Sequence, residues 1–315
     1  MIALCTESSH TRGMGHLFRA MVLAEGLRAA GHAVKFYVND HPATAALLIQ
    51  RGLPFEVVPL EDIERNWESK VIERDDIKVW VFDRHRTDQR SAHRIKAKDI
   101  PLVTFDDRGG GAALADLHIA AMPCEDGREF AGKRVLTGIR YLMLDPAIAA
   151  FRRQRSAVES MVVTLGGADT YGVTTKIMRL LSGRALRKTV ILGPAFLHEN
   201  DLAPHWTSDF VIKRSVPSLI EEFARHDVAV TGGGMTPFEA NAAGLPCIVV
   251  ANEDFEVPVG RELAKLGGAV FAGHHSALDE SLFALDLPVA KMSRAGIQAV
   301  PIDGTQRVVE AIVAL

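Results

Sequence analysis

The chain alternates short apolar runs of strand length with longer segments of helical period, and this alternation restricts it to a parallel α/β architecture. The runs Ile2–Cys5 and Val34–Val38 are typical of strands, and His16–Ala30 between them is typical of a helix that ends at Gly31. Repeated strand, helix, strand units predict parallel neighbouring strands. We expect further strands at 55–58, 79–82, 102–105 and 117–120, and helices at 42–51, 61–73 and 91–98.

A basic amphipathic helix is predicted at 146–155, after which the alternation starts again with a strand at 161–165. The 315 residues are enough for two domains of ordinary size. We therefore expect two Rossmann-like α/β domains, 1–150 and 151–315, facing an interdomain cleft. The second domain is predicted to hold strands at 189–192, 210–213, 228–231 and 247–250, and helices at 173–181, 217–224, 236–243, 257–265 and 305–315.

Composition excludes several classes of protein. With 36 basic and 39 acidic residues, a net charge of −3, the chain lacks the basic surface that nucleic-acid binding requires. Cys5, Cys124 and Cys247 show neither disulfide nor metal spacing, which favours reduced thiols and a cytoplasmic location. The sequence shows neither a basic leader nor an apolar stretch of about 20 residues, so we expect no secretion and no membrane partner.

A glycine turn, Gly13-Met14-Gly15-His16, joins the first strand to the first helix. Its glycines allow close approach of a ligand, and the free N–H groups of the new helix favour an anion. A histidine side chain can act as a general base near neutral pH, so His16 is a candidate for general base catalysis, although a histidine at this place can also simply cap the helix or pack. Arg12 and Arg19 are close enough in sequence to meet a phosphate or an acidic sugar, or are solvated surface residues.

A second glycine turn, Gly232-Gly233-Gly234, follows the strand at 228–231, with Thr236 as the expected N-cap of the next helix. Its backbone amides are suited to a diphosphate. Glu239, about one turn further along, can accept hydrogen bonds from ribose hydroxyls, or can merely complement the helix dipole. A third glycine turn, Gly166-Gly167, follows the strand at 161–165. It either lies close to the ligand or forms only a tight turn.

Acidic residues follow two strands of the first domain, where ligands of parallel sheets bind. Asp83-Arg84-His85 comes after the strand at 79–82, and Asp106-Asp107 after the strand at 102–105. A carboxylate there can orient His16 or hold a sugar hydroxyl. Adjacent aspartates also suggest a metal ion, but the sequence shows no third ligand at a supporting spacing, so we expect no metal.

Taken together, these motifs resemble the nucleotide-sugar hydrolases of pseudaminic acid biosynthesis and the related spore-coat polysaccharide proteins, which have a glycosyltransferase-B-like (GT-B-like) fold. The resemblance covers most of the chain. It implies that His16 assists the attack of water on the anomeric carbon without a metal or another cofactor, and that the second domain holds UDP. The motifs that carry it are Gly13-Met14-Gly15-His16 to Arg19, Asp106-Asp107, 138–144, Leu165-Gly166-Gly167-Ala168-Asp169, 232–239 and Asp303-Gly304.

The sequence departs from the pattern of that family at two places. Asp83-Arg84-His85 stands where the family has Asp-x-Tyr, and Asn252-Glu253 stands where it often has Asn-Gln. Both changes alter groups expected to face the hexose, so the identity of the sugar stays open. The expected sites are a catalytic set of His16, Asp83 and His85, a nucleotide set of Gly166, Gly167, Gly233, Gly234, Thr236 and Glu239, and a sugar set of Gly15, Arg19, Asp106, Asn252 and Glu253.

The resulting functional hypothesis is a hydrolase that releases a free amino or deoxy sugar and a nucleoside diphosphate by inverting attack of water. One alternative is a glycosyltransferase in which His16 deprotonates an acceptor hydroxyl. Another is a non-catalytic protein that binds a nucleotide sugar. His16 separates the last of these from the others, because a binding protein has little use for a base beside the anomeric carbon.

Overall fold

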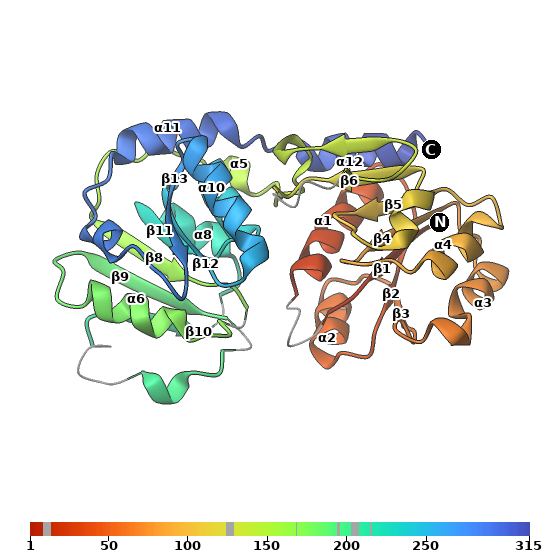
Figure 1. The fold of residues 1–315 in the computed structure, drawn as a ribbon, viewed down its shortest axis with the longest axis horizontal. Coiled ribbons are helices and arrows are strands. Elements are labelled where there is room, and N and C mark those ends of the chain that lie inside the picture. The colour runs from red at the N-terminus through yellow and green to blue at the C-terminus, as the bar shows by residue number, and fades with distance from the viewer. Residues whose placement is uncertain (9–13, 124–128, 168, 194–195, 203–207, 215) are drawn as a thin grey trace. The chain divides into compact units, whose positions relative to one another are not determined.

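The computed structural model describes residues 1–8, 14–123, 129–167, 169–193, 196–202, 208–214 and 216–315. The chain forms two compact α/β units, drawn in Figure 1. The first comprises Met1–Leu144 and Asp303–Leu315, and the second comprises Asp145–Ile302.

The end of the chain returns to the first unit, which differs from the predicted division into 1–150 and 151–315. Helix α12 (Gly304–Val313) packs against α1 (Gly15–Ala29), also in the first unit. Val308 and Ile312 are fully buried in one apolar cluster with Leu23 of α1. Burial of this apolar face explains why a helix separated from the first unit by the whole second unit belongs to it.

The first unit is built on a parallel sheet of seven strands in the order β3-β2-β1-β4-β5-β6-β7. Six of them were predicted from the sequence, and β7 was not. Their bounds are β1 Ile2–Thr6, β2 Val34–Val38, β3 Phe55–Val57, β4 Val79–Asp83, β5 Leu102–Phe105, β6 Leu117–Ala120 and β7 Val135–Thr137.

Side chains of β1 alternate between two apolar layers. Ile2 and Leu4 join the cluster that contains α1 and α12, whereas Ala3 and Cys5 join the cluster under the opposite helices. Both faces of this sheet are therefore covered, as a doubly wound parallel sheet requires. The helices of this unit besides α1 and α12 are α2 Pro42–Gln50, α3 Trp67–Arg74 and α4 Gln89–Lys96.

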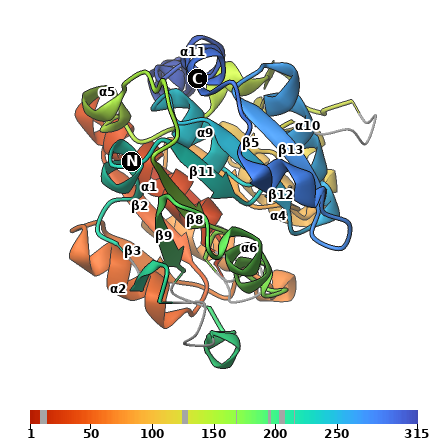
Figure 2. The same cartoon turned by 90° about the vertical axis from the view of Figure 1, so that its left-hand side faces the viewer.

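The second unit contains a parallel sheet of six strands in the order β10-β9-β8-β11-β12-β13. Figure 2 labels β9, β8, β11, β12 and β13 of this sheet. The edge strand β13 was not predicted. The strands are β8 Ser160–Thr164, β9 Arg187–Leu192, β10 Val211–Arg214, β11 Val228–Thr231, β12 Cys247–Ala251 and β13 Ala269–His274. The helices are α5 Ile148–Phe151, α6 Val173–Leu181, α8 Leu219–Ala224, α9 Thr236–Ala242, α10 Val257–Lys265 and α11 Val289–Ala299.

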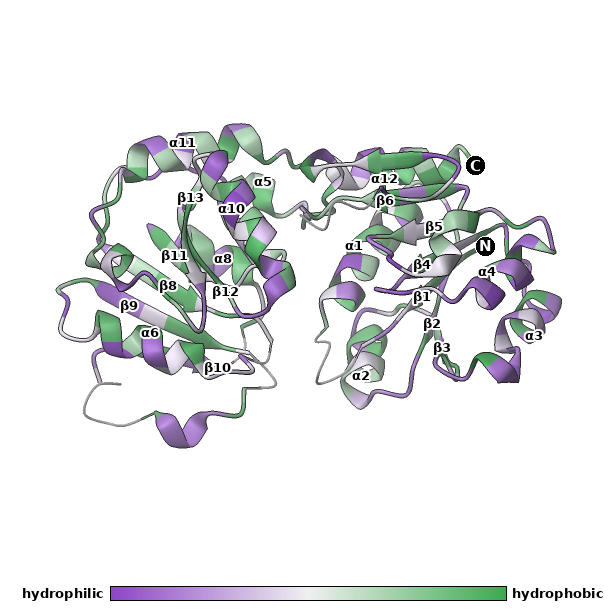
Figure 3. Cartoon of the chain, viewed as in Figure 1, coloured by the Kyte–Doolittle hydropathy of each residue, from purple (hydrophilic) through white to green (hydrophobic). Residues whose placement is uncertain are grey.

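Hydropathy varies along the helices of the second unit; α10 was predicted from the sequence, whereas α11 was not. In Figure 3, α10 and α11 show hydrophobic and hydrophilic stretches side by side, as partly buried helices do. No helix among the described residues combines the length and the apolar composition needed to cross a bilayer.

Cys5 and Cys247 are buried free thiols, as predicted. Cys124 lies outside the described residues.

The predicted amphipathic helix at 146–155 is wrong for most of its length, since α5 spans only Ile148–Phe151. The backbone is extended at Arg152, which ends the helix, and Arg155 beyond it is buried and donates hydrogen bonds to four backbone carbonyls of this unit. These carbonyls belong to Arg153, Phe223, His226 and Ala243. Burial, followed by the nearby charge of Arg153, lowers the pKa of Arg155 to about 10. The basic residue at this position therefore holds loop ends together inside the unit.

Candidate functional site

The glycine turn of the first unit lies at the topological switch point of its sheet. Strands β1 and β4 are neighbours, and the chain continues from β1 to β2 on one side and from β4 to β5 on the other. In register, Thr6 at the end of β1 is opposite Asp83 at the end of β4. Ligands of open parallel sheets bind at such a point, beyond the carboxyl ends of the strands.

His16 and Asp83 meet at this point, although 67 residues separate them. His16 Nδ1 lies 2.6 Å from Asp83 Oδ1, and the His16 side chain is 13% exposed. An ionised carboxylate only accepts hydrogen bonds, so Nδ1 carries a proton and donates a hydrogen bond to Asp83. When His16 is neutral, this tautomer leaves Nε2 unprotonated, which is the state that a general base requires.

Arg19 forms the centre of the same network. Its Nε and Nη2 donate to the two carboxylate oxygens of Asp83 at 2.9 and 2.5 Å, and its Nη1 donates to Asp106 Oδ2. Burial alone would raise the pKa of Asp83, but the charges of Arg19 and His16 and their hydrogen bonds lower it well below the usual range. Asp83 is therefore ionised near neutral pH, and Arg19 is a buried clamp between two carboxylates.

The aspartates at the end of β5 have different partners. Asp106 adopts a left-handed backbone with φ of 46° and accepts hydrogen bonds from Arg19 and from the Met122 N–H. Strained conformations of this kind persist where the surroundings hold them, often at functional sites. Asp107 instead accepts from the N–H groups of Thr87 and Gly109, which fixes the following loop.

Metal binding finds no support in these contacts. Within the part of the chain that the structure describes, no three histidine, cysteine or acidic side chains converge in a way that would hold an ion. The oxygens of Asp83 and Asp106 already accept from Arg19.

His85 lies beside His16, with the rings edge to face and their centroids 4.4 Å apart. Burial, followed by the positive charges of His16 and Arg19, lowers the pKa of His85 to about 4. His85 is therefore neutral at neutral pH. Arg84, which lies between Asp83 and His85 in the sequence, makes a different contact: its Nη2 lies 3.3 Å from Glu7 Oε2.

Several positions at the glycine turn can be placed, and others cannot. Gly15 is exposed, and a β-carbon there would meet nothing within 4 Å. Arg12 and Gly13 lie outside the described residues. Sequence reasoning missed Asn39, whose amide bonds both backbone groups of Ser8 and so ties the loop after β1 to the end of β2.

In the second unit, β8 and β11 occupy the equivalent switch point, and both are followed by glycine turns. Gly166 has a φ of 86°, a conformation that favours glycine, and Gly166 and Gly167 are both exposed. Ala168 lies outside the described residues. Asp169 accepts from the N–H groups of Val173 and Thr174 and so satisfies two free backbone donors in the first turn of α6.

The turn after β11 is held by a residue that the sequence analysis missed. Glu256 Oε2 accepts from the Gly233 N–H at 3.2 Å and from the Asn252 N–H at 2.7 Å. A β-carbon on Gly233 would lie 2.5 Å from Glu256 Cβ, so only glycine fits there. Burial raises the pKa of Glu256, although its backbone hydrogen bonds oppose this effect.

This bridge changes the interpretation of the glycine turn. The Gly233 N–H, expected to bind a diphosphate, already donates to Glu256. At Gly234 a β-carbon would meet nothing within 4 Å. The glycine triplet indicates that another group lies close to the backbone of the turn. That group is Glu256, which follows a different strand, β12, and cannot be identified from the sequence of the turn.

Thr236 is the first residue of α9 rather than its N-cap, which is Met235 and makes no side-chain capping bond. The prediction of a threonine cap was therefore wrong, because Met235 already has helical dihedral angles. Glu239 lies in the first turn of this helix and is half-buried. Burial, and next the charge of Asp145, raises its pKa to about 7. In the described part of the chain no side chain donates a hydrogen bond to the Glu239 carboxylate.

Asn252 and Glu253 follow β12. The Asn252 side chain is 8% exposed, and its Oδ1 has no hydrogen-bond partner among the described residues. Glu253 is half-buried and forms a hydrogen bond with Tyr171. An unpartnered buried amide oxygen is costly, so this end of β12 is suited to a polar ligand.

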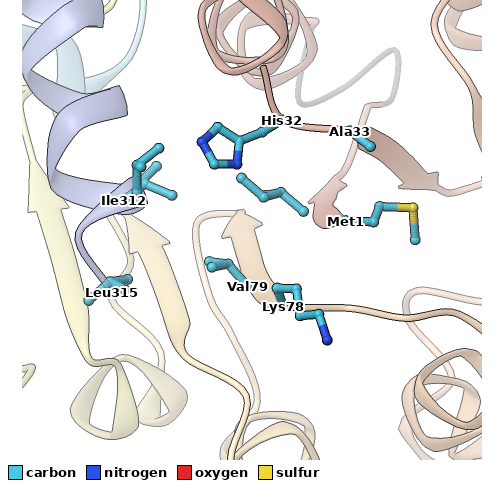
Figure 4. A pocket seen from close by; sticks show the side chains of 9 residues that line it. Met1, His32, Ala33, Lys78, Val79, Ile312 and Leu315 are labelled. Carbon is cyan, nitrogen blue, oxygen red and sulfur yellow. The ribbon is translucent and has the colours of Figure 1, made fainter. Parts of the chain in front are cut away.

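A hollow of the first unit lies away from the residues described above (Figure 4). It is lined by Ile2 and Val79 at the amino ends of β1 and β4, by His32, and by Ile312 near the end of the chain. Ligands of parallel sheets bind at the opposite, carboxyl edge. We therefore place the candidate site at the carboxyl ends of the strands.

Comparison with proteins of known sequence finds distant relatives, and no family model matches the chain. The uncharacterized protein MJ1062 of Methanocaldococcus jannaschii is 24% identical over 276 residues, which are 81% of this chain and 56% of that protein. The chain thus spans little more than half the length of that relative. The spore coat polysaccharide biosynthesis protein SpsG of Bacillus subtilis is 22% identical over 291 residues, covering 86% of this chain and 83% of SpsG.

Solved structures establish the fold. MurG of Acinetobacter baumannii superposes with a TM-score of 0.74 at 13% identity, covering 100% of this chain and 99% of MurG. Anabaena Alr3699/HepE in complex with UDP gives 0.67 at 13% identity, with 100% of both chains covered. The glycosyltransferase VinC in complex with dTDP gives 0.65 at 14% identity, covering 100% and 99%. The chain has the GT-B fold, which confirms the predicted fold class.

Proposed function

We propose that the protein is an enzyme that hydrolyses a nucleotide-activated amino or deoxy sugar to the free sugar and a nucleoside diphosphate. The observation that carries the proposal is the contact of His16 with the ionised Asp83, at the switch point of the first sheet. The fold and the similarity to SpsG support a substrate of the nucleotide-sugar class.

In the proposed reaction, His16 Nε2 takes a proton from a water molecule while the water oxygen attacks C1 of the sugar. The bond from C1 to the oxygen of the β-phosphate breaks, and the nucleoside diphosphate leaves with that bonding pair. The configuration at C1 is inverted. Asp83 is a positioning residue, since it holds the tautomer and the orientation of His16 and stabilises the imidazolium that forms.

Other residues of the first unit are assigned according to their contacts. Arg19 keeps Asp83 ionised and fixes Asp106, so both act on the sugar site chiefly by holding its shape. His85 is neutral and lies against His16, where it is suited to a hydrogen bond with a sugar hydroxyl or with the attacking water. Gly15 leaves the turn open to the ligand.

We assign the nucleotide to the second unit. Glu239, which has no protein donor in the described residues and a raised pKa, is suited to accept hydrogen bonds from ribose hydroxyls. Gly234, Thr236 and the exposed pair Gly166-Gly167 are assigned to the diphosphate. Gly233 contributes through its contact with Glu256, and Asn252 and Glu253 are assigned to the sugar.

The experiment is a panel of UDP- and dTDP-activated sugars incubated with the protein without an acceptor, with release of nucleoside diphosphate as the readout. We expect His16→Ala to bind the diphosphate like the unaltered protein and to turn over about 10² to 10⁴ times more slowly. His32→Ala is the matched control, because His32 lies at the hollow on the other edge. Equal turnover in the two variants would refute the mechanism.

A glycosyltransferase is the second candidate, because the structures compared include glycosyltransferases. There, His16 would deprotonate an acceptor hydroxyl instead of water. Diphosphate release that requires an added acceptor, and transfers the sugar to it, would favour this reaction over hydrolysis.

A further inference from the structure

A pair of aromatic rings, Tyr171 exposed and His275 half-buried, lies at the carboxyl edge of the second sheet. Tyr171, in the loop between β8 and α6, is 47% exposed. Its ring stacks on His275, with centroids 3.9 Å apart and planes inclined by 13°. His275 directly follows β13, and its N–H donates to the Ala251 carbonyl at the end of β12. The loop after β8 thus reaches a residue that follows the edge strand.

Polar groups fix this pair and leave it uncharged. The Tyr171 hydroxyl donates to Glu253, and the charge of Glu253 together with this bond raises the pKa of the phenol. Burial and the neighbouring charge of His274 lower the pKa of His275. Both rings are therefore neutral at neutral pH, and a carboxylate adjoins them.

The pair adds little to the packing of the unit, since neither ring belongs to its buried apolar cluster. A neutral aromatic face next to a carboxylate complements a pyranose ring: the apolar C–H face packs on the aromatic ring, and hydroxyls donate to the carboxylate. Glu253 has acceptor sites beyond the one that Tyr171 uses. Its neighbour Asn252 supplies a buried amide oxygen without a protein partner in the described residues.

We propose that Tyr171 and His275 form a stacking platform for the pyranose ring of the nucleotide sugar, with Glu253 and Asn252 accepting from its polar groups. The proposal deepens the proposed function and rests on it. A nucleobase is another part of such a ligand that can stack on an aromatic ring, and the experiment distinguishes the nucleobase from the pyranose.

The experiment measures binding of UDP and of UDP-N-acetylglucosamine, and of dTDP and dTDP-glucose, by calorimetry. For Tyr171→Ala we expect about tenfold weaker binding of the nucleotide sugar that the protein takes, with the affinity for the diphosphate alone within twofold. Tyr171→Phe keeps the ring and should lose about threefold or less. His275→Ala should also weaken binding of the nucleotide sugar, because it removes the ring on which Tyr171 stacks.

Val211→Ala is the control, since Val211 is 59% exposed on β10, at the other edge of this sheet. An equal loss for the diphosphate and the sugar conjugate would assign the platform to the base and overturn the proposal. Unchanged binding of both ligands by Tyr171→Ala would also overturn it. Absence of diphosphate binding by the unaltered protein would overturn the proposed function itself, which is a separate result.

Discussion

Replacement of Asp83 by asparagine tests the network around His16 most directly. Asp83 is 4% exposed and accepts three hydrogen bonds, one from His16 and two from Arg19. Asparagine retains one acceptor oxygen and presents an NH₂ group to the remaining donors. Removing one partner of a buried ion pair lowers the free energy of unfolding by about 3 to 5 kcal/mol. Because Arg19 keeps Asp106, we expect the lower value, about 3 kcal/mol.

The assay is thermal unfolding at pH 7, followed by circular dichroism. For a unit of this size, about 3 kcal/mol corresponds to a decrease in Tm of roughly 6 to 12 °C. Asp76→Asn is the control, since Asp76 is 80% exposed in its pair with Lys78 and such pairs contribute about 1 kcal/mol or less. A decrease for Asp83→Asn no larger than for the control would refute the buried network.

For Asp83→Asn we also expect the loss of stability to depend on pH. The pKa of Asp83 is lower in the folded chain than in the unfolded chain, so its contribution to stability is complete above the unfolded value of about 3.9. The contribution is lost as the pH falls below that value toward the folded pKa. The stability difference between Asp83→Asn and the unaltered protein should therefore shrink as the pH is lowered from 5 to 2.

Two further predictions concern the second unit. Glu239→Gln removes a carboxyl whose pKa rises from 4.5 to about 7 on folding, which destabilises the folded unit as the pH rises through this interval. We expect the variant to be more stable by about 1 to 3 kcal/mol at pH 8 in urea unfolding, and to bind nucleoside diphosphate more weakly; an unchanged midpoint would contradict the raised pKa. Glu256→Ala should weaken binding of nucleoside diphosphate at least tenfold, since the backbone amides of Gly233 and Asn252 lose their acceptor. Glu256→Gln keeps an acceptor oxygen and should retain most of the affinity. Equal affinities for these two variants would argue against the bridge.

The sequence predicts those parts of the fold that depend on local patterns. Helix α6 at 173–181 and strand β2 at 34–38 have the predicted bounds, because their apolar periods are regular. Strand β13 was missed, since only part of it is buried and its alternation is weak. The sequence overestimated α5, because the buried contacts of Arg155 with carbonyls about 70 residues away cannot be inferred from a local amphipathic pattern.

The candidate site was predictable in its position but not in its contacts. Both His16 and Asp83 follow strands of the first sheet, so their common edge could be inferred. The clamp of Arg19 depends on partners 64 and 87 residues away, and a pattern within one helix does not reveal them. Glu256 was missed for the same reason, since its partner Gly233 is 23 residues distant and follows another strand.

The return of α12 to α1 makes the second unit an insertion within the first. During synthesis, residues 145–302 are all present before the last segment of the first unit has been made. The first unit can therefore complete its fold only after the whole of the inserted unit has been made. The unit that carries His16 thus depends on residues made on both sides of its insertion, and its last helix covers the helix that starts at the glycine turn.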